Sequence, residues 1–202
     1  MYRIFTTVTI LLALTLSTAS FAADKPVRTI KDGILDEARL FVDKPPQAKT
    51  VVIRLFSATD ADIVEGEKKE ETKTMQADAP KMLAERIVEK LKDYGTFTSV
   101  TIGDKETPAG AWILEGKFVE LDPGSRAKRY LVGFGAGKSA VKVSGSIKGA
   151  DGTVLAEFEQ RRVGTMGVAG GDSIKKLTSD VKSIGEDLAK FLSEWAKGKK
   201  LD

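Results

Sequence analysis

The chain of 202 residues contains no cysteine and no histidine. Without cysteine it can form neither a disulfide nor a thiolate nucleophile, and without histidine it lacks the usual general base and the commonest zinc ligand. Catalytic arrangements of the Ser-His-Asp and Cys-His kinds are therefore excluded. An enzyme built from this sequence would depend on carboxylates, lysine, tyrosine or a metal held by oxygen ligands. We predict a protein that is not an enzyme and that carries no cofactor and no metal.

An excess of one charge is also missing. Lysine and arginine number 32 against 29 acidic residues, so the formal net charge is only +3. Nucleic-acid binding requires a concentrated basic face, which this balance does not indicate. With 42% hydrophobic and 30% charged residues, the composition is typical of a globular protein with a substantial core. Beyond the N-terminus no apolar run is long enough to predict a transmembrane helix.

Residues 1–22 have the pattern of a secretory signal peptide. Arg3 supplies the positive start, residues 4–16 are apolar but too few to span a bilayer, and Ser-Phe-Ala at 20–22 is a small-x-small cleavage site. We expect cleavage near Ala22 and a periplasmic or secreted location. Because no cysteine stands at the cleavage site, we expect that the protein is not a lipoprotein.

After this signal the pattern divides into a polar N-terminal segment at 23–49, one α+β domain at 50–197 and a basic tail at 198–202. The N-terminal segment holds a candidate short helix near 35–41, and Pro45 and Pro46 end any regular element there. The charge-dense stretch at 59–79 shows no apolar periodicity, which predicts a solvated loop or a frayed helix.

Two helices are predicted within the domain. The first covers 78–94, with Pro80 in the first helical position, Gly95 just past the end and an apolar stripe along one side. The second covers 172–197, where apolar residues recur at alternating spacings of three and four. That spacing favours a helix packed across a sheet, and a coiled-coil seam remains the alternative.

Strands are predicted by β-branched runs and by alternation of apolar and polar residues. We place them at 50–56, 97–102, 112–121, 140–148 and 153–160, with a hairpin turn at 149–152. The predicted fold class is therefore α+β, with two helices over one face of a mostly antiparallel sheet and the other face left available.

The least ordinary stretch is G-S-R-A-K-R-Y-L-V-G-F-G-A-G-K-S at 124–139. If 130–147 form one extended strand, its glycines fall on a single face, which suggests close approach by another backbone, a helix or a ligand. A bulge or corner is the alternative. A phosphate-binding loop is not supported, because its first glycine would stand at Val132 and because the following residues alternate like a strand.

This stretch supplies a candidate interaction surface for a partner chain or for the closing helix. Its backbone amides and basic side chains could alternatively form an anion-binding nest. The candidate residues are Arg126, Arg129, Gly133, Gly135, Gly137 and Lys138.

The same motif, preceded by L-E-G-K-F-V-E-L-D-P, resembles the signature of the domain-of-unknown-function 4410 family of bacterial envelope proteins, many of them described as lipoproteins. The resemblance extends over about 50–195 and implies a cell-envelope location without implying an activity. The order of elements is also similar to that of the periplasmic domain of the curli secretion channel, which is a likeness of fold alone.

Three classes of function remain open. The favoured one is a non-enzymatic envelope interaction or assembly module, acting through an envelope protein partner or through self-association. The second is a binder of small anionic ligands that uses the glycine-rich strand and its neighbouring arginines and lysine. The third is a carboxylate-based hydrolase, which needs two acids facing each other across a cleft, and no sequence pattern points to such a pair.

Overall fold

The computed structural model describes residues 25–62, 69–103, 107–123, 139–164 and 173–201. The predicted signal peptide at 1–22 lies outside these residues. Within these residues, two helices and seven strands form one α+β unit; the sequence predicted this class and the two helices, but not the strands β1 and β2. In chain order they are β1 (Arg28–Lys31), β2 (Glu37–Leu40), β3 (Thr50–Ile53), α1 (Lys69–Tyr94), β4 (Ser99–Ile102), β5 (Trp112–Asp122), β6 (Ala140–Gly149), β7 (Val154–Val163) and α3 (Ser173–Ala196).

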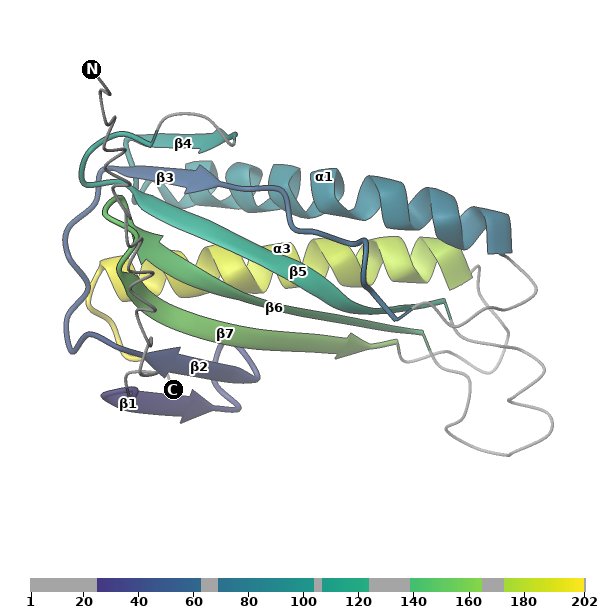
Figure 1. Ribbon diagram of the computed structural model, residues 1–202, viewed down its shortest axis with the longest axis horizontal. Helices are drawn as coiled ribbons and strands as arrows, with labels where there is room; N and C mark the ends of the chain where they lie inside the picture. The colour runs from purple at the N-terminus through teal and green to yellow at the C-terminus, as the bar shows by residue number, and fades with distance from the viewer. Residues whose placement is uncertain (1–24, 63–68, 104–106, 124–138, 165–172, 202) are drawn as a thin grey trace, which may run out of the picture.

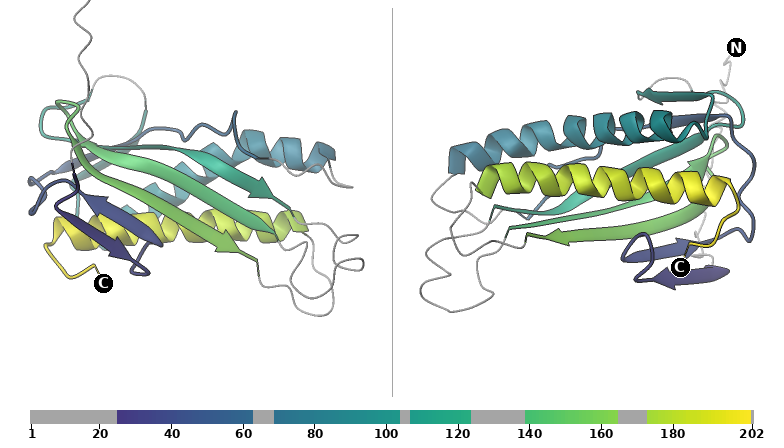
Figure 2. Two further views of the ribbon diagram at one scale, coloured as in Figure 1. Left: turned by 60° about the horizontal axis from the view of Figure 1, so that its bottom comes forward. Right: turned by 180° about the vertical axis from the view of Figure 1, so that it is seen from behind.

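The strands form a single sheet in the order β1-β2-β7-β6-β5-β3-β4 (Figure 1). Strand β3 runs parallel to β4 and β5, and the other neighbours are antiparallel, so the expectation of a mostly antiparallel sheet is confirmed. Both helices lie on the same side of the sheet (Figure 2, right). The opposite side faces the viewer without helical cover in Figure 1.

The core fills the space between the sheet and the helices. Alternation along β6 sets its orientation, because Val141, Val143 and Ile147 are buried while the residues between them are more exposed. At one end of the core, the Trp112 ring packs against Trp195 of α3, with ring centroids 5.3 Å apart. Burial of these apolar faces is the main contribution that holds the helices onto the sheet.

The N-terminal segment differs from its prediction. Residues near 35–41 form no helix; β2 is a strand that pairs antiparallel with β1 and with β7. Ala38 and Leu40 are buried, whereas Glu37 and Arg39 are only partly buried. Because β2 pairs with β7, every second residue of β2 faces the core. The sheet therefore includes two strands that precede residue 50, where the sequence placed the start of the domain.

The first helix is longer than predicted. Helix α1 begins at Lys69 rather than at 78, so Pro80 lies inside it. Met75 and Ala79 are buried and continue the apolar stripe toward the N-terminus. A proline in a helix interior costs about 3 kcal/mol, and the packing of these earlier turns offsets that cost. Tyr94, the last residue of the helix, is 39% exposed.

Helix α3 packs its apolar stripe inside the chain, against the sheet and α1. This agrees with the favoured reading of the alternating three- and four-residue spacing. The buried members are Leu177, Val181, Ile184, Leu188, Phe191 and Trp195. Beyond the helix, Leu201 is also buried, at 3% exposure, and its carbonyl accepts a hydrogen bond from Ile34 N at 3.4 Å. The residues predicted as a basic tail therefore contribute to the core.

Candidate functional site

The candidate surface predicted in the glycine-rich stretch lies outside the described residues. This applies to each of its members: Arg126, Arg129, Gly133, Gly135, Gly137 and Lys138. The described residues that flank the stretch lie at one end of the sheet, where Asp122 pairs with Ala140 and Ala140 pairs with Val163.

A buried polar cluster lies at the same end of the sheet. Ser139, which is fully buried, donates its hydroxyl to Asp180 Oδ2 at 3.4 Å, and Lys176 Nζ lies 3.2 Å from Asp180 Oδ1. The carbonyl of Ser139 accepts a 2.8 Å hydrogen bond from Gly164 N. The cluster thus joins the first turns of α3 to the point where β6 begins and β7 ends.

A second polar cluster connects β7 to α3 and to the β1–β2 turn. The amide of Gln160 accepts from Asp36 N at 2.8 Å and donates to Asp187 Oδ2 at 2.7 Å, and Arg162 also pairs with Asp187. Because Gln160 is buried and both ends of its amide have partners, the cluster satisfies a polar group that would otherwise be costly to bury. We assign both clusters a structural role.

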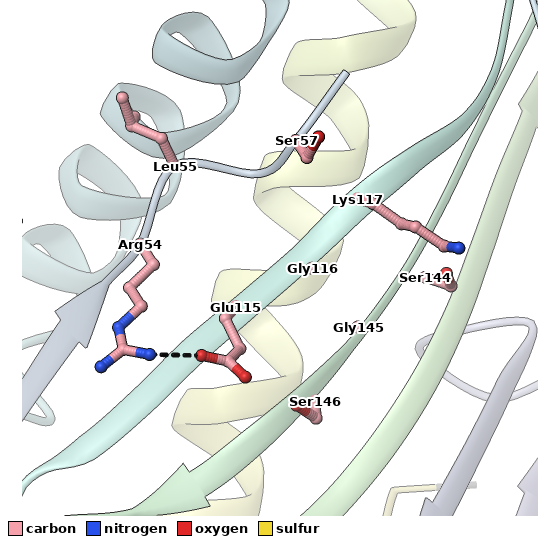
Figure 3. A pocket seen from close by; sticks show the side chains of 9 residues that line it. All are labelled: Arg54, Leu55, Ser57, Glu115, Gly116, Lys117, Ser144, Gly145 and Ser146. Atoms are coloured by element: carbon pink, nitrogen blue, oxygen red, sulfur yellow. Dashed lines mark hydrogen bonds and ion pairs between the residues drawn. The ribbon is translucent and has the colours of Figure 1, made fainter. Parts of the chain in front are cut away.

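The open face of the sheet carries a shallow trough at its centre, formed by two adjoining hollows of about 510 and 310 Å3. Both hollows lie over Ser144, Gly145 and Ser146 of β6, the fourth of the seven strands. These three small residues lie between long charged side chains on β5 and β7. The larger hollow is shown in Figure 3 and is lined by Arg54, Leu55, Ser57, Glu115, Gly116, Lys117, Ser144, Gly145 and Ser146.

Strand register arranges the trough in two rows. In the first row, Ser144 stands between Lys117 of β5 and Glu159 of β7. In the second, Ser146 stands between Glu115 and Glu157. Directly opposite residues in a sheet have neighbouring side chains, so each serine hydroxyl has a charged group on both sides. Figure 3 shows Lys117 reaching from β5 toward Ser144.

Ion pairs hold the carboxylates of the trough. Arg54 Nη1 lies 2.7 Å from Glu115 Oε2, and Lys148 Nζ lies 2.5 Å from the other oxygen of the same group. Burial acts to raise the pKa of Glu115, but the hydrogen-bonded ion pairs with Lys148 and Arg54 together outweigh it and lower the pKa. This carboxylate is therefore held in its charged form.

A pair of glycines, Gly116 and Gly145, forms the floor of the trough. A side chain at either position would point into the core. Gly116 and Gly145 face each other across β5 and β6. A Cβ on Gly116 would lie 2.6 Å from the Phe56 ring, and one on Gly145 would lie 2.6 Å from the Phe158 ring. The two phenylalanine rings, 6.2 Å apart, thus occupy the space under the floor.

Sequence reasoning predicted an uncovered sheet face but did not identify this trough. The signal was present as Ser-Gly-Ser between Lys142 and Lys148 in a strand with clear alternation. It could be recognised only with the neighbouring strands known, because the charged walls come from β5, β7, β2 and Arg54, the residue after β3.

Neither a metal site nor a membrane-spanning helix is supported by the described part of the chain. Within it, no group of three or more acidic residues is placed to hold a metal ion. No described helix has a stretch both long and apolar enough to cross a bilayer.

The family model of a domain of unknown function, DUF4410, matches residues 39–168. The chain belongs to the DUF4410 family. This confirms the resemblance inferred from the glycine-rich motif. The match extends from the second half of β2 through β7 and includes every charged residue that lines the trough. No curated protein shows significant similarity to the chain.

Among solved structures, the chain is similar to the PelC dodecamer from Paraburkholderia phytofirmans, at 15% identity and a TM-score of 0.46, with 75% of this chain and 96% of that chain covered. It is also similar to protein XCC0632 from Xanthomonas campestris, of the DUF330 family, at 11% identity and a TM-score of 0.47, with 77% and 90% covered. Both likenesses are too distant to bear on function or assembly.

Proposed function

We propose that this DUF4410 protein is an exported, non-enzymatic interaction module of the bacterial cell envelope. The observation that carries the proposal is the asymmetry of the sheet. Its inner face is filled by α1 and α3, whereas its outer face presents a trough of charged and hydroxyl side chains without helical cover. A surface of this kind supplies hydrogen-bonding and charged groups for recognition of another molecule.

A non-enzymatic role is supported by the chemistry of the trough. The chain has no histidine and no cysteine to serve as base or nucleophile. A general acid at neutral pH needs a carboxyl group whose pKa is raised, yet the pKa of Glu115 is lowered by its two cationic partners. The groups of the trough are thus suited to charge pairing rather than to proton transfer.

Export is supported by the signal pattern at 1–22 and by the cell-envelope location that the resemblance to this family implies. In an oxidising compartment the protein would gain no stability from disulfides, because the chain has no cysteine. The core and the two polar clusters would then have to supply the stability of the mature protein.

The partner in this proposal is another envelope protein or a second copy of the chain. A stable protein interface buries roughly 800 Å2 on each partner, which is more than a small ligand covers. Seven strands about 4.8 Å apart make an outer face roughly 30 Å wide, with the trough at its centre.

Site-specific photocrosslinking in intact cells tests the proposal. A photoreactive amino acid is placed at Ser144 on the trough and, as a control, at the exposed Lys182 on α3. We expect a discrete crosslinked product from position 144 only, in the periplasmic or secreted fraction. Crosslinks to the protein itself identify a second copy as the partner. Equal products from both positions, or none from 144, would contradict the proposal.

A further inference from the structure

We propose that the partner presents an acidic segment to the larger hollow, with one carboxylate bound by Lys117 beside Ser144 and a second bound by Arg54. This inference rests on the proposed function and specifies the chemistry of the partner. It is carried by the balance of charges around the trough and by the groups left without partners.

The trough has more cations than carboxylates. Its lining and the lysines paired with it comprise five cations (Arg39, Arg54, Lys117, Lys142 and Lys148) and three carboxylates (Glu115, Glu157 and Glu159). Beside the trough, Glu37 pairs with both Lys31 and Arg39, and Arg161 faces Glu120, Asp36 and Asp122, so these neighbours carry more carboxylates than cations. The excess of positive charge therefore belongs to the trough itself.

The excess is concentrated at the larger hollow. Glu157 pairs with Arg39 and Glu159 with Lys142, which neutralises the β7 side. On the β5 side, Glu115 alone faces both Arg54 and Lys148. Lys117 forms no ion pair with any residue in the described ranges. Two incoming carboxylates would thus each meet a cation whose charge is not fully compensated, Lys117 on one side of the hollow and Arg54 on the other (Figure 3).

Hydrogen-bond donors are also free in this hollow. Arg54 uses only Nη1 toward Glu115 in the described contacts, so other N–H groups of its guanidinium can donate to a ligand. The hydroxyls of Ser144 and Ser146 have no hydrogen-bond partner within the described part of the chain. A carboxylate accepts from several donors at once, and charge-assisted hydrogen bonds of this kind are the stronger ones.

The shape of the hollow favours a protein segment over a free small molecule. Sites for small ligands bury most of the ligand surface within a concave pocket. Here the lining comes from one sheet face and the adjoining residues of the β3 end, and the hollow is open to solvent above them. A protein surface supplies the opposing wall that this hollow lacks.

A titration of the 15N-labelled mature protein tests the inference by amide chemical-shift changes. The probe is the peptide acetyl-Gly-Glu-Glu-Gly-amide, and the matched control is acetyl-Gly-Gln-Gln-Gly-amide at the same ionic strength. We expect saturable shifts at 115–117 and 144–146 with the glutamate peptide only. Shifts scattered over the surface, or equal shifts with both peptides, would overturn the acidic-segment assignment.

Variants identify the groups responsible. We expect Lys117→Gln to weaken peptide binding about tenfold, in line with the loss of one charged hydrogen bond. Lys182→Gln, at an exposed lysine of α3 without an ion pair among described residues, should leave binding unchanged. If both variants weaken binding equally, the attraction is general and the assignment to this hollow is wrong.

A third arm uses inorganic phosphate as the probe. Shifts at 115–117 and 144–146 with phosphate, but none with the glutamate peptide, would assign the hollow to a free oxyanion and contradict an acidic partner segment. The crosslinking from Ser144 is independent of these titrations. A crosslinked partner without peptide binding would refute this inference and leave the proposed function standing.

Discussion

Gly145 of β6 lies directly opposite Gly116 of β5, and the ring of Phe158 closes against it from the inner side of the sheet. A Cβ built on Gly145 would collide with the backbone oxygen of Glu115 and would lie 2.6 Å from Phe158 Cζ. The backbone oxygen cannot withdraw without disturbing the β5–β6 ladder. Packing, rather than an unusual backbone angle, therefore requires glycine at this position.

The first prediction concerns this close approach. Gly145→Ala should lower the free energy of unfolding by about 1–3 kcal/mol, as expected for overpacking a filled core. Urea denaturation followed by tryptophan fluorescence measures it, since Trp112 and Trp195 are both buried. Gly103→Ala is the control, because no described atom lies within 4 Å of a Cβ built there. Equal stabilities for the two variants would refute this account of the glycine pair.

The second prediction concerns the buried carboxylate beside Ser139. Asp180→Ala removes the acceptor of a fully buried hydroxyl and the partner of Lys176. An unsatisfied buried polar group costs about 1–3 kcal/mol, so we expect a loss of unfolding free energy in that range. Asp180→Asn keeps an acceptor oxygen and should lose less. Asp93→Ala, at an exposed ion pair, should change stability by no more than about 0.5 kcal/mol.

The third prediction concerns pH. Because the folded pKa of Glu115 is lowered from its ordinary 4.5, its contribution to stability is present above 4.5 and is lost as pH falls through the folded pKa. Glu115→Gln should therefore lose less unfolding free energy than the native protein when the pH is lowered from neutrality to below 4.5. Denaturation at the two pH values measures this difference. Glu85→Gln, on the exposed side of α1, should keep the native pH dependence.

The fourth prediction concerns the C-terminal residues. Leu201→Ala empties a position that is only 3% exposed in the core, and such a truncation costs about 2 kcal/mol or more. Lys197→Ala, at an exposed position just past α3, is the matched control and should be near neutral. If Leu201→Ala behaves like the control, the C-terminal residues do not belong to the cooperative core.

The sequence predicted most regular elements because their signals are local. Alternation along 140–148 and the stripe of 172–197 each show one face that must be buried, whatever the partner. Gly95 was expected just past α1, and it has the positive φ of 59° that favours glycine at a helix end. The family resemblance was carried by one motif and is confirmed by the model match.

The errors occurred where the signal depended on a distant partner. The four residues of β2 become a strand only because β7 and β1 pair with them, and four residues are too few for periodicity to decide. Likewise, the early turns of α1 are charge-dense along the chain, yet Met75 contacts Thr178 of α3, with Sδ 3.8 Å from Oγ1. Tertiary packing thus outweighed the local preference around Pro80.

By itself the sequence determined the α+β class, the family, the expectation of export and the absence of histidine and cysteine chemistry. These follow from composition, from short-range periodicity and from one motif. Only the tertiary structure decided which side chains meet on the open face. A trough lies over Ser144 and Ser146 because β5 and β7 place charged residues on either side of them, and strand order and register are set by packing of the whole sheet.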